Sequence, residues 1–378
     1  MTLTLEALRR GDDLSREDVD AFLESGTFPV VEGTKVTFVF RGDVEEVALR
    51  HWIQGLPSEQ PFERIAGTDV WLVTLEIPEC SRVEYKLQVT EQGRTALIRD
   101  PLNPHTAQDP YGANSVVHAA GYELPSWTLP DAEARSGRVQ ELSFQSEAFG
   151  DVRKVLVYEP ARYREARRYP LLIVHDGADF LRFASLETVL DNLIHRLEIT
   201  PMIVALTDSP RRLVEYADDE RQARFLVDEL VPALESRYPI IGTPEARGLV
   251  GASFGAVASL SAAWRRPGVF GNLFLLSGSF AFTDIGDHEK GPIFDPVVEF
   301  VNAFRANPGR PAERVFLTCG TYETPIYYNR TMATVLQGAG IDLKYVEARD
   351  GHNWENWRDR MREGLSWLFP GPLWLVYE

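Results

Sequence analysis

The pattern of hydrophobic and polar residues differs between the two halves of the chain. Between Val30 and about Val117, short apolar runs alternate with polar residues and are separated by turns rich in Gly and Asp. This period of two predicts β-strands, and their regular spacing favours a β-sandwich of roughly 100 residues. We expect strands at 36–40, 46–49, 70–75, 83–89 and 95–98, with the turn-rich segments 100–104 and 110–114 closing the unit.

A short helix is expected before these strands. Ser15 and Asp18 have the spacing of a helix-capping pair, and Val19, Phe22 and Leu23 follow at helical spacing. Pro29 ends the predicted helix.

From about Gly137 the pattern changes to alternating strands and helices, which predicts a parallel sheet covered by helices on both faces. A hairpin of edge strands is expected at 139–144 and 152–158, and further strands at 169–175, 202–206, 249–250, 273–277, 315–320 and 343–347. Helices are expected at 183–197, 223–238, 256–264, 328–337 and 354–368. The Pro-rich and charged stretch from Leu124 to Arg138 has the composition of a linker, so we expect one domain at 1–130 and a second at 131–378.

Composition narrows the choice of partners. The chain has 378 residues, 44% hydrophobic and 25% charged, with a net charge of −17. This charge argues against nucleic acid or an anionic membrane as a partner, and it disfavours a polyanionic substrate unless basic residues gather at the site. Cys80 and Cys319 lie far apart, which indicates neither a disulfide framework nor a metal site. We see no basic region followed by an apolar core at the N-terminus and no membrane-spanning run, so the default expectation is a cytoplasmic protein.

The segment Gly251–Gly255 fits the pattern G-x-S-x-G, with an apolar strand before it and an Ala-rich helix after it. A sharp turn in that context lifts a serine hydroxyl above the sheet, where it can act as a nucleophile. Ser253 is therefore the candidate nucleophile, and the alternative is an ordinary tight turn.

A serine hydroxyl needs a base, and His352 is the candidate. It follows the last predicted strand, and in α/β-hydrolases the nucleophile, the acid and the histidine occur in that order along the chain. The alternative is that His352 packs against Trp354 or Trp357. His288 lies in a polar loop, and His175, which precedes Ser253, is expected to be structural.

The base in turn needs a carboxylate to orient it. Glu323 follows the strand 315–320 closely and is the preferred acid, with Asp284, Asp295 and Asp350 as rivals. Two amides must hold the oxyanion. One is expected from Phe254, the residue after the nucleophile, and the other from Gly177 or Ala178 in the loop after an earlier strand.

These motifs together resemble the esterase family that includes enterochelin esterases, feruloyl esterases and bacterial mycolyltransferases. The resemblance rests on 153–160, 176–177, 211–216, 229–232, 251–255, 319–323 and 351–357. It implies an α/β-hydrolase domain preceded by an immunoglobulin-like, early-set sandwich, which the segment 100–104 also suggests. It further implies the triad Ser253, Glu323 and His352, and a substrate pocket near Asp176, Arg211, Glu215 and Trp357. The turn departs from the family pattern at Ala256, where Gly is commoner, and at the bulky Phe254.

We therefore expect a serine esterase that acts on a small-molecule ester and needs no metal or other cofactor. Two alternatives remain open: a carbohydrate- or partner-binding protein with weak hydrolase activity, and an acyltransferase of the same fold. Trp71, Tyr85 and Tyr111 would form the binding face in the first of these, although strand aromatics are more often buried. The sequence leaves open whether the chain forms a homo-oligomer.

Overall fold

The computed structural model describes residues 4–10 and 14–372, which form two compact units. The first unit comprises the chain up to Leu124 together with the short segments 321–323 and 349–351. The second comprises 125–320, 324–348 and the chain from His352 onward, so residues 125–130 group with it. Residues 1–3 and 11–13, part of the stretch on which the expectation about a secretory signal rests, lie outside the described residues.

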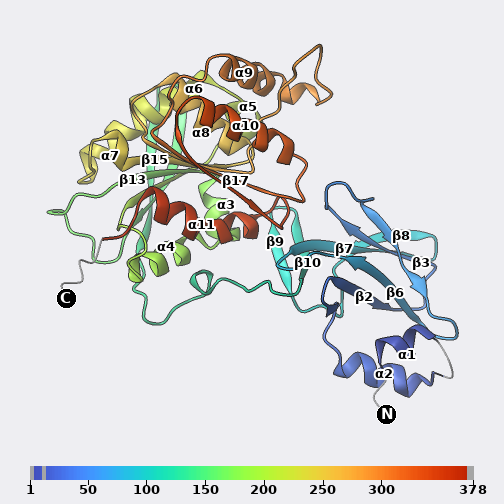
Figure 1. Ribbon diagram of the computed structural model, residues 1–378. Helices are drawn as coiled ribbons and strands as arrows, with labels where there is room; N and C mark the ends of the chain where they lie inside the picture. The colour runs from blue at the N-terminus through green and yellow to red at the C-terminus, as the bar shows by residue number, and fades with distance from the viewer. Residues whose placement is uncertain (1–3, 11–13, 373–378) are drawn as a thin grey trace. The chain divides into compact units, whose positions relative to one another are not determined.

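Two short helices open the first unit. The expected helix is present as α2 (Arg16–Ser25), and its capping box joins Ser15 and Asp18 as the spacing predicts. The preceding helix α1 (Leu5–Arg10) is only six residues long and is not among the elements that the sequence pattern predicts. Apolar side chains of both helices pack in one cluster with Val39 and Val70. Figure 1 shows α1 and α2 lying side by side against the strands of this unit.

The first unit is otherwise all β, as expected. One sheet has the strand order β1-β2-β6-β5, and the other has the order β4-β3-β7-β10-β9 with β8 beside β7. Phe38 and Trp71 from the first sheet share a core with Leu49 and Tyr85 from the second. The strand bounds are β1 Val30–Glu32, β2 Lys35–Arg41, β3 Glu46–His51, β4 Glu59–Pro61, β5 Glu63–Arg64, β6 Val70–Glu76, β7 Arg82–Glu91, β8 Arg94–Ile98, β9 Thr106–Asp109 and β10 Gly112–His118.

The expected turn at 110–114 is wrong in its second half, because Gly112 begins β10. The segment has turn-forming residues, but Asn114 and Ser115 are buried and pair with neighbouring strands. Tertiary pairing therefore overrides the local preference.

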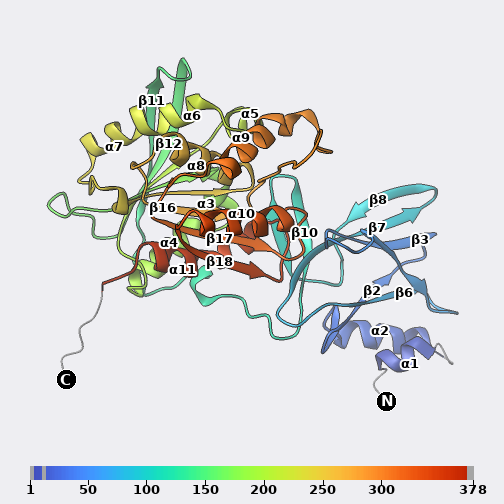
Figure 2. The same ribbon diagram turned by 45° about the horizontal axis from the view of Figure 1, so that its top comes forward.

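The second unit is built on an eight-stranded sheet with the order β11-β12-β14-β13-β15-β16-β17-β18. The hairpin β11–β12 is antiparallel and stands at one edge, as the sequence predicts, and the strands from β14 to β18 are parallel (Figure 2). Their bounds are β11 Arg138–Ser146, β12 Asp151–Glu159, β13 Leu171–His175, β14 Ile203–Thr207, β15 Arg247–Ala252, β16 Asn272–Leu276, β17 Arg314–Gly320 and β18 Asp342–Ala348.

Helices cover both faces of this sheet because its strands are apolar on both sides. Leu172 and Val174 face a core shared with α3 (Gly177–Phe183), α4 (Leu186–His195) and α11 (Trp354–Leu368). Leu171 and Ile173 face a larger core shared with α6 (Glu220–Arg224), α7 (Val231–Arg237), α8 (Phe254–Arg265), α9 (Asp295–Ala306) and α10 (Ile326–Gly338). The short helix α5 (Arg212–Glu215) ends directly before Tyr216, which belongs to the same core. Figure 1 shows the two helical layers on either side of the strands.

Two predicted helices differ from the observed ones. The helix expected at 183–197 is interrupted because Ser185 has a φ of +49°, so the chain turns between α3 and α4. The helix expected at 223–238 is present, but its middle, Phe225–Leu230, is a π-helix between α6 and α7.

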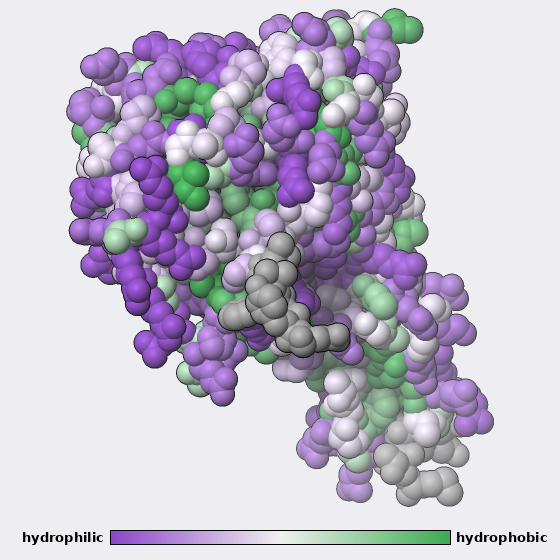
Figure 3. Space-filling model, turned by 60° about the vertical axis from the view of Figure 1, so that its left-hand side comes forward, coloured by the Kyte–Doolittle hydropathy of each residue, from purple (hydrophilic) through white to green (hydrophobic). Residues whose placement is uncertain are grey.

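None of the described helices is long and apolar enough to cross a bilayer. The face drawn in Figure 3 is mostly hydrophilic, with small apolar spots scattered among charged residues. This distribution is ordinary for a chain in which a quarter of the residues are charged.

Candidate active site

The candidate residues follow strands of the parallel part of the sheet. Ser253 comes directly after β15, and His352 follows the last residue of β18 by four positions. Glu323 follows Gly320, the end of β17, by three positions along the chain. Ligands and catalytic groups of open α/β sheets gather at the carboxyl ends of the strands. Along the chain, the candidate nucleophile, acid and histidine thus follow β15, β17 and β18, which is the order expected for an α/β-hydrolase.

Ser253 occupies a strained turn between β15 and α8. Its φ of +56° and ψ of −118° are rare for a residue with a side chain, and such strain concentrates at functional sites. Gly251 is required because a Cβ there would stand 2.1 Å from the carbonyl oxygen of Gly255. Ser253 remains partly exposed, and its Oγ lies 3.0 Å from Oγ of Ser279. The sequence motif has therefore formed the sharp turn that it predicts.

Two helix amino termini lie close to this turn in the structure. Phe254 is the first residue of α8, and Gly177 is the first residue of α3, so their amides have no partner within their helices. The amide of Ala178 donates to the carboxylate of Asp208 at 3.3 Å. Of the two donors that the sequence left open, Gly177 is thus the better candidate. The side chain of Phe254 is buried, with its ring centroid 5.2 Å from that of Phe294.

Arg212 ties the Gly177 loop to the serine turn. It donates to both carboxylate oxygens of Asp176 over 2.7–2.9 Å, and it also donates to the carbonyl of Ala252 at 3.2 Å. Asp176 itself has a left-handed backbone and is 6% exposed. Sequence reasoning missed Arg212, although it lies next to Arg211 in a segment that the family resemblance singled out. It fixes the relative position of the two candidate oxyanion donors.

His352 is exposed, and its ring meets Trp357 edge to face with 5.1 Å between the centroids. The indole nitrogen of Trp357 donates to Oγ of Ser277, which directly follows β16. Leu276, the residue before Ser277, accepts the amide of Ser253. This chain of contacts connects the surroundings of His352 to the serine turn. Packing on Trp357, the alternative role for His352, is thus present and is compatible with a role as base.

Glu323 is 1% exposed, unlike two of its three rivals. Asp295 contacts His288 at 2.9 Å, and its side chain is 59% exposed. Asp284 pairs with Arg305, and its side chain is 64% exposed. A buried carboxylate suits the orientation of a histidine better than an exposed one. The acid role of Glu323 stays a prediction.

The predicted substrate residues have different surroundings. Glu215 has no exposed surface and accepts hydrogen bonds from Arg153 at 2.6 and 3.1 Å and from Ser209 at 2.5 Å. Burial raises the pKa of Glu215, but these hydrogen bonds outweigh that effect and the pKa is lowered. The side chain of Arg211 is 58% exposed and reaches Glu215 at 3.4 Å. Arg211 is thus exposed while its partner Glu215 is buried, and the role of both at a substrate pocket stays a prediction.

The structure also shows the surroundings of His175 and of the aromatic residues considered for a binding face on the sandwich. His175 is completely buried between Val250 and Ser259, and burial lowers its pKa to about 4, so it is neutral at pH 7 and structural as expected. In the sandwich, Trp71 and Tyr85 are buried, whereas Tyr111 is 93% exposed on a turn. These aromatics therefore do not form an exposed row.

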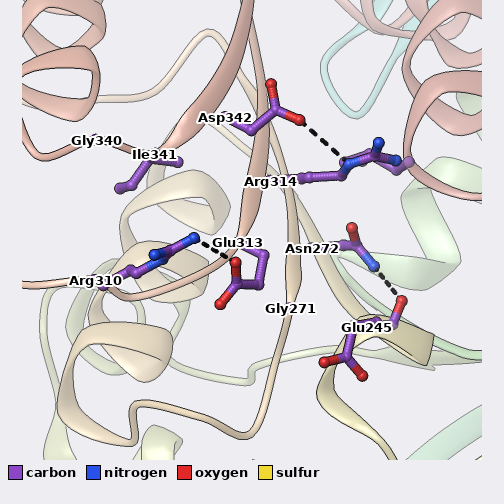
Figure 4. A pocket seen from close by; sticks show the side chains of 10 residues that line it. Glu245, Gly271, Asn272, Arg310, Glu313, Arg314, Gly340, Ile341 and Asp342 are labelled. Atoms are coloured by element: carbon purple, nitrogen blue, oxygen red, sulfur yellow. Dashed lines mark hydrogen bonds and ion pairs between the residues drawn. The ribbon is translucent and has the colours of Figure 1, made fainter.

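A cavity of about 580 Å³ lies at the opposite end of the sheet. Its walls include Asn272, Arg314 and Asp342, at the amino ends of β16, β17 and β18. Its two arginines are engaged, because Arg314 pairs with Asp342 and Arg310 pairs with Glu313 (Figure 4). The cavity is thus separate from the serine turn. The described residues contain no cluster of three or more His, Cys, Asp or Glu side chains that could hold a metal ion.

Comparison with protein-family models gives two matches. A model described as "Putative esterase" covers residues 146–368, well over half of the chain. The chain belongs to this esterase family. A second model, for the N-terminal domain of enterochelin esterase, matches residues 35–137.

Members of the esterase family with similar sequences include an iron(III) enterobactin esterase of Escherichia coli O6:H1, 25% identical over 82% of each chain. An uncharacterized protein of Bacillus subtilis, YjcH, is 26% identical over 61% of this chain and 98% of its own length. Among solved structures, the ferric enterobactin esterase of Salmonella typhimurium has a TM-score of 0.77 at 22% identity, covering 92% of this chain and 98% of its own. A ferulic acid esterase of Anaeromyces mucronatus has a TM-score of 0.54 at 19% identity, covering 64% and 94%. These findings make the chain a carboxylic ester hydrolase with an enterochelin esterase-like fold.

Proposed function

We propose that the chain hydrolyses its ester through an acyl-enzyme, with Ser253 as nucleophile, His352 as base and Glu323 as the acid that orients His352. The observation that carries this proposal is the conformation of Ser253, a partly exposed serine held at φ +56° between β15 and α8. A backbone strained in this way is characteristic of a nucleophile elbow.

In the proposed reaction, Ser253 Oγ bonds to the ester carbonyl carbon while its proton passes to His352. The amides of Phe254 and Gly177 donate hydrogen bonds to the negative oxygen. Arg212 holds these two amides in place relative to each other through its hydrogen bonds to Asp176 and Ala252. The bond to the leaving alcohol then breaks, and His352 gives that alcohol its proton. Water, activated by the same histidine, releases the acid and restores the free serine.

For the substrate we propose an ester of an enterobactin-type siderophore. The relatives that match most of this chain are named enterobactin esterases, whereas the ferulic acid esterases match less than two thirds of it. The net charge of −17 opposes a polyanionic ligand, so this assignment needs cationic groups at the site. Arg211 is one such exposed group.

The test is an ester panel with matched variants. Wild type, Ser253→Ala and the control Ser236→Ala, a surface serine of α7, are assayed on p-nitrophenyl acetate and butyrate, a feruloyl ester, a catecholate siderophore and an acetylated sugar. Ser253→Ala should lose hydrolysis of every active ester while keeping the thermal midpoint of wild type. Retained activity in Ser253→Ala refutes the mechanism. A higher kcat/KM on the feruloyl ester than on the siderophore refutes the substrate assignment, and acyl products on an added sugar instead of free acid would identify a transferase.

A further inference from the structure

The first unit holds two short segments that come from the loops after β17 and β18. Residues 321–323 and 349–351 group with the chain up to Leu124 and not with the strands that they follow. The first segment ends at Glu323, and the second ends one residue before His352. The first unit thus includes Glu323 itself and the residue directly before His352.

Backbone hydrogen bonds anchor both segments. The amide of Arg82 donates to the carbonyl of Arg349 at 3.0 Å, and the amide of Gln54 donates to the carbonyl of Tyr322 at 2.9 Å. The segments also bind each other, because the amide of Tyr322 donates to the carbonyl of Asp350 at 3.2 Å. Oγ of Ser81 lies 2.6 Å from the hydroxyl of Tyr322. Both segments are therefore fixed to the start of β7, and the first is also fixed to the chain after β3.

A buried charge cluster lies at the centre of this contact. The side chain of Arg82 is 0% exposed and contacts the carboxylate of Asp350 at 3.3 Å and that of Glu84 at 2.9 Å. The same Asp350 carboxylate accepts the amide of Gly351 at 2.7 Å, and Glu84 is held in turn by Asn114 at 2.7 Å. A buried charge without its partner is strongly unfavourable, so the cluster defines one position for Asp350.

We propose that Arg82, through Asp350, is a positioning residue for the esterase reaction. It fixes the backbone at 349–351, and that backbone determines where the next residue, His352, begins. The sandwich then serves catalysis as a support for the loops, which is a different role from binding a carbohydrate. This inference rests on the proposed role of His352.

The test compares Arg82→Met, Arg82→Lys, Asp350→Asn and the double variant Arg82→Met/Asp350→Asn. Arg41→Met is the matched control, since Arg41 is another paired arginine of this unit whose partners are Asp20 and Asp69. Active sites are counted by titration with a fluorophosphonate, so that kcat is expressed per competent site. A merely structural role would lower the number of competent sites and leave kcat per site unchanged.

We expect Arg82→Met and Asp350→Asn each to lower kcat per site by about 10- to 100-fold, with KM changed by less than about twofold, because a small misplacement of a catalytic group has effects of this size. The double variant should be no worse than the poorer single variant, Arg82→Lys should recover part of the loss, and Arg41→Met should match wild type. If Arg82→Met does not fold, Arg82→Lys and Asp350→Asn decide the question.

Wild-type kcat per site in Asp350→Asn, or a double variant whose loss is the product of the single losses, would overturn the positioning role. If Ser253→Ala is inactive while the Arg82 and Asp350 variants behave like wild type, only this inference fails. If Ser253→Ala keeps its activity, the proposed mechanism fails first.

Discussion

Arg212 and Asp176 form a three-bond ion pair beside the serine turn, with nitrogen–oxygen distances of 2.7–2.9 Å. A guanidinium that meets a carboxylate with two nitrogens fixes orientation as well as distance. Because the same guanidinium also donates to the carbonyl of Ala252, it links the residue before Gly177 to the residue before Ser253.

We predict that Arg212→Met lowers kcat about 100-fold and that Arg212→Lys lowers it about tenfold, because the lysine keeps the charge but not the two-pronged geometry. Steady-state kinetics on a short-chain nitrophenyl ester measures both. Arg221→Met is the control, since Arg221 pairs with Asp219 within its own helix start. An Arg212→Met enzyme with the kcat of wild type would show that the amides of Phe254 and Gly177 keep their positions without Arg212.

Glu323→Gln should lower kcat by about three to four orders of magnitude, because the amide no longer stabilises the charged imidazole or selects its tautomer. Glu313→Gln, at an exposed ion pair near the other end of β17, should leave kcat unchanged. The measurement is the rate of ester hydrolysis together with the thermal midpoint. Unchanged hydrolysis in Glu323→Gln would move the acid role to Asp295 or Asp284.

Gly177→Ala should damage both stability and catalysis. A Cβ at Gly177 would stand 2.3 Å from Cβ of Leu206 and 2.6 Å from its Cα, so the backbone of the candidate oxyanion loop must shift. We expect the free energy of unfolding to fall by about 3 kcal/mol, with a loss of kcat. Gly291→Ala, where a Cβ meets nothing within 4 Å, is the control for denaturant unfolding and for hydrolysis. Equal stability of the two variants would contradict this account.

Asp208 predicts a pH dependence of stability. Burial of its carboxyl group, with the nearby Asp176 and Asp179, raises its pKa to about 6 although the amide of Ala178 opposes this. The folded state therefore binds more protons than the unfolded state between about pH 4 and pH 6, and stability contributed by this group falls as pH rises through that window. The residue as a whole is exposed, so solvent screening keeps the effect small.

The variant Asp208→Asn isolates this effect. Its thermal midpoint minus that of wild type should increase from pH 4 to pH 6 and then level off. A difference that is constant across this range would show that Asp208 titrates normally. Asp287→Asn, at an exposed loop position, provides the baseline.

Local patterns predicted the elements that depend on neighbours in sequence. The capping pair Ser15 and Asp18, the elbow around Ser253 and the helix that begins at Trp354 are set by contacts within a few residues, and each is present as expected. The sequence could also favour Glu323 and His352 over other acids and histidines, because each follows a predicted strand that comes after Ser253 in the chain.

Other features depended on residues that meet only after folding. The strand that begins at Gly112 and the break at Ser185 contradict local preference because pairing and packing determine them. The brace of Arg212 on Asp176 and the burial of Arg82 against Asp350 join residues 36 and 268 positions apart. Local sequence preferences cannot predict contacts between residues so far apart in the chain. Opposite charges attract each other more strongly where water is excluded, although removing that water costs free energy, and only the tertiary structure determines which charges are buried together.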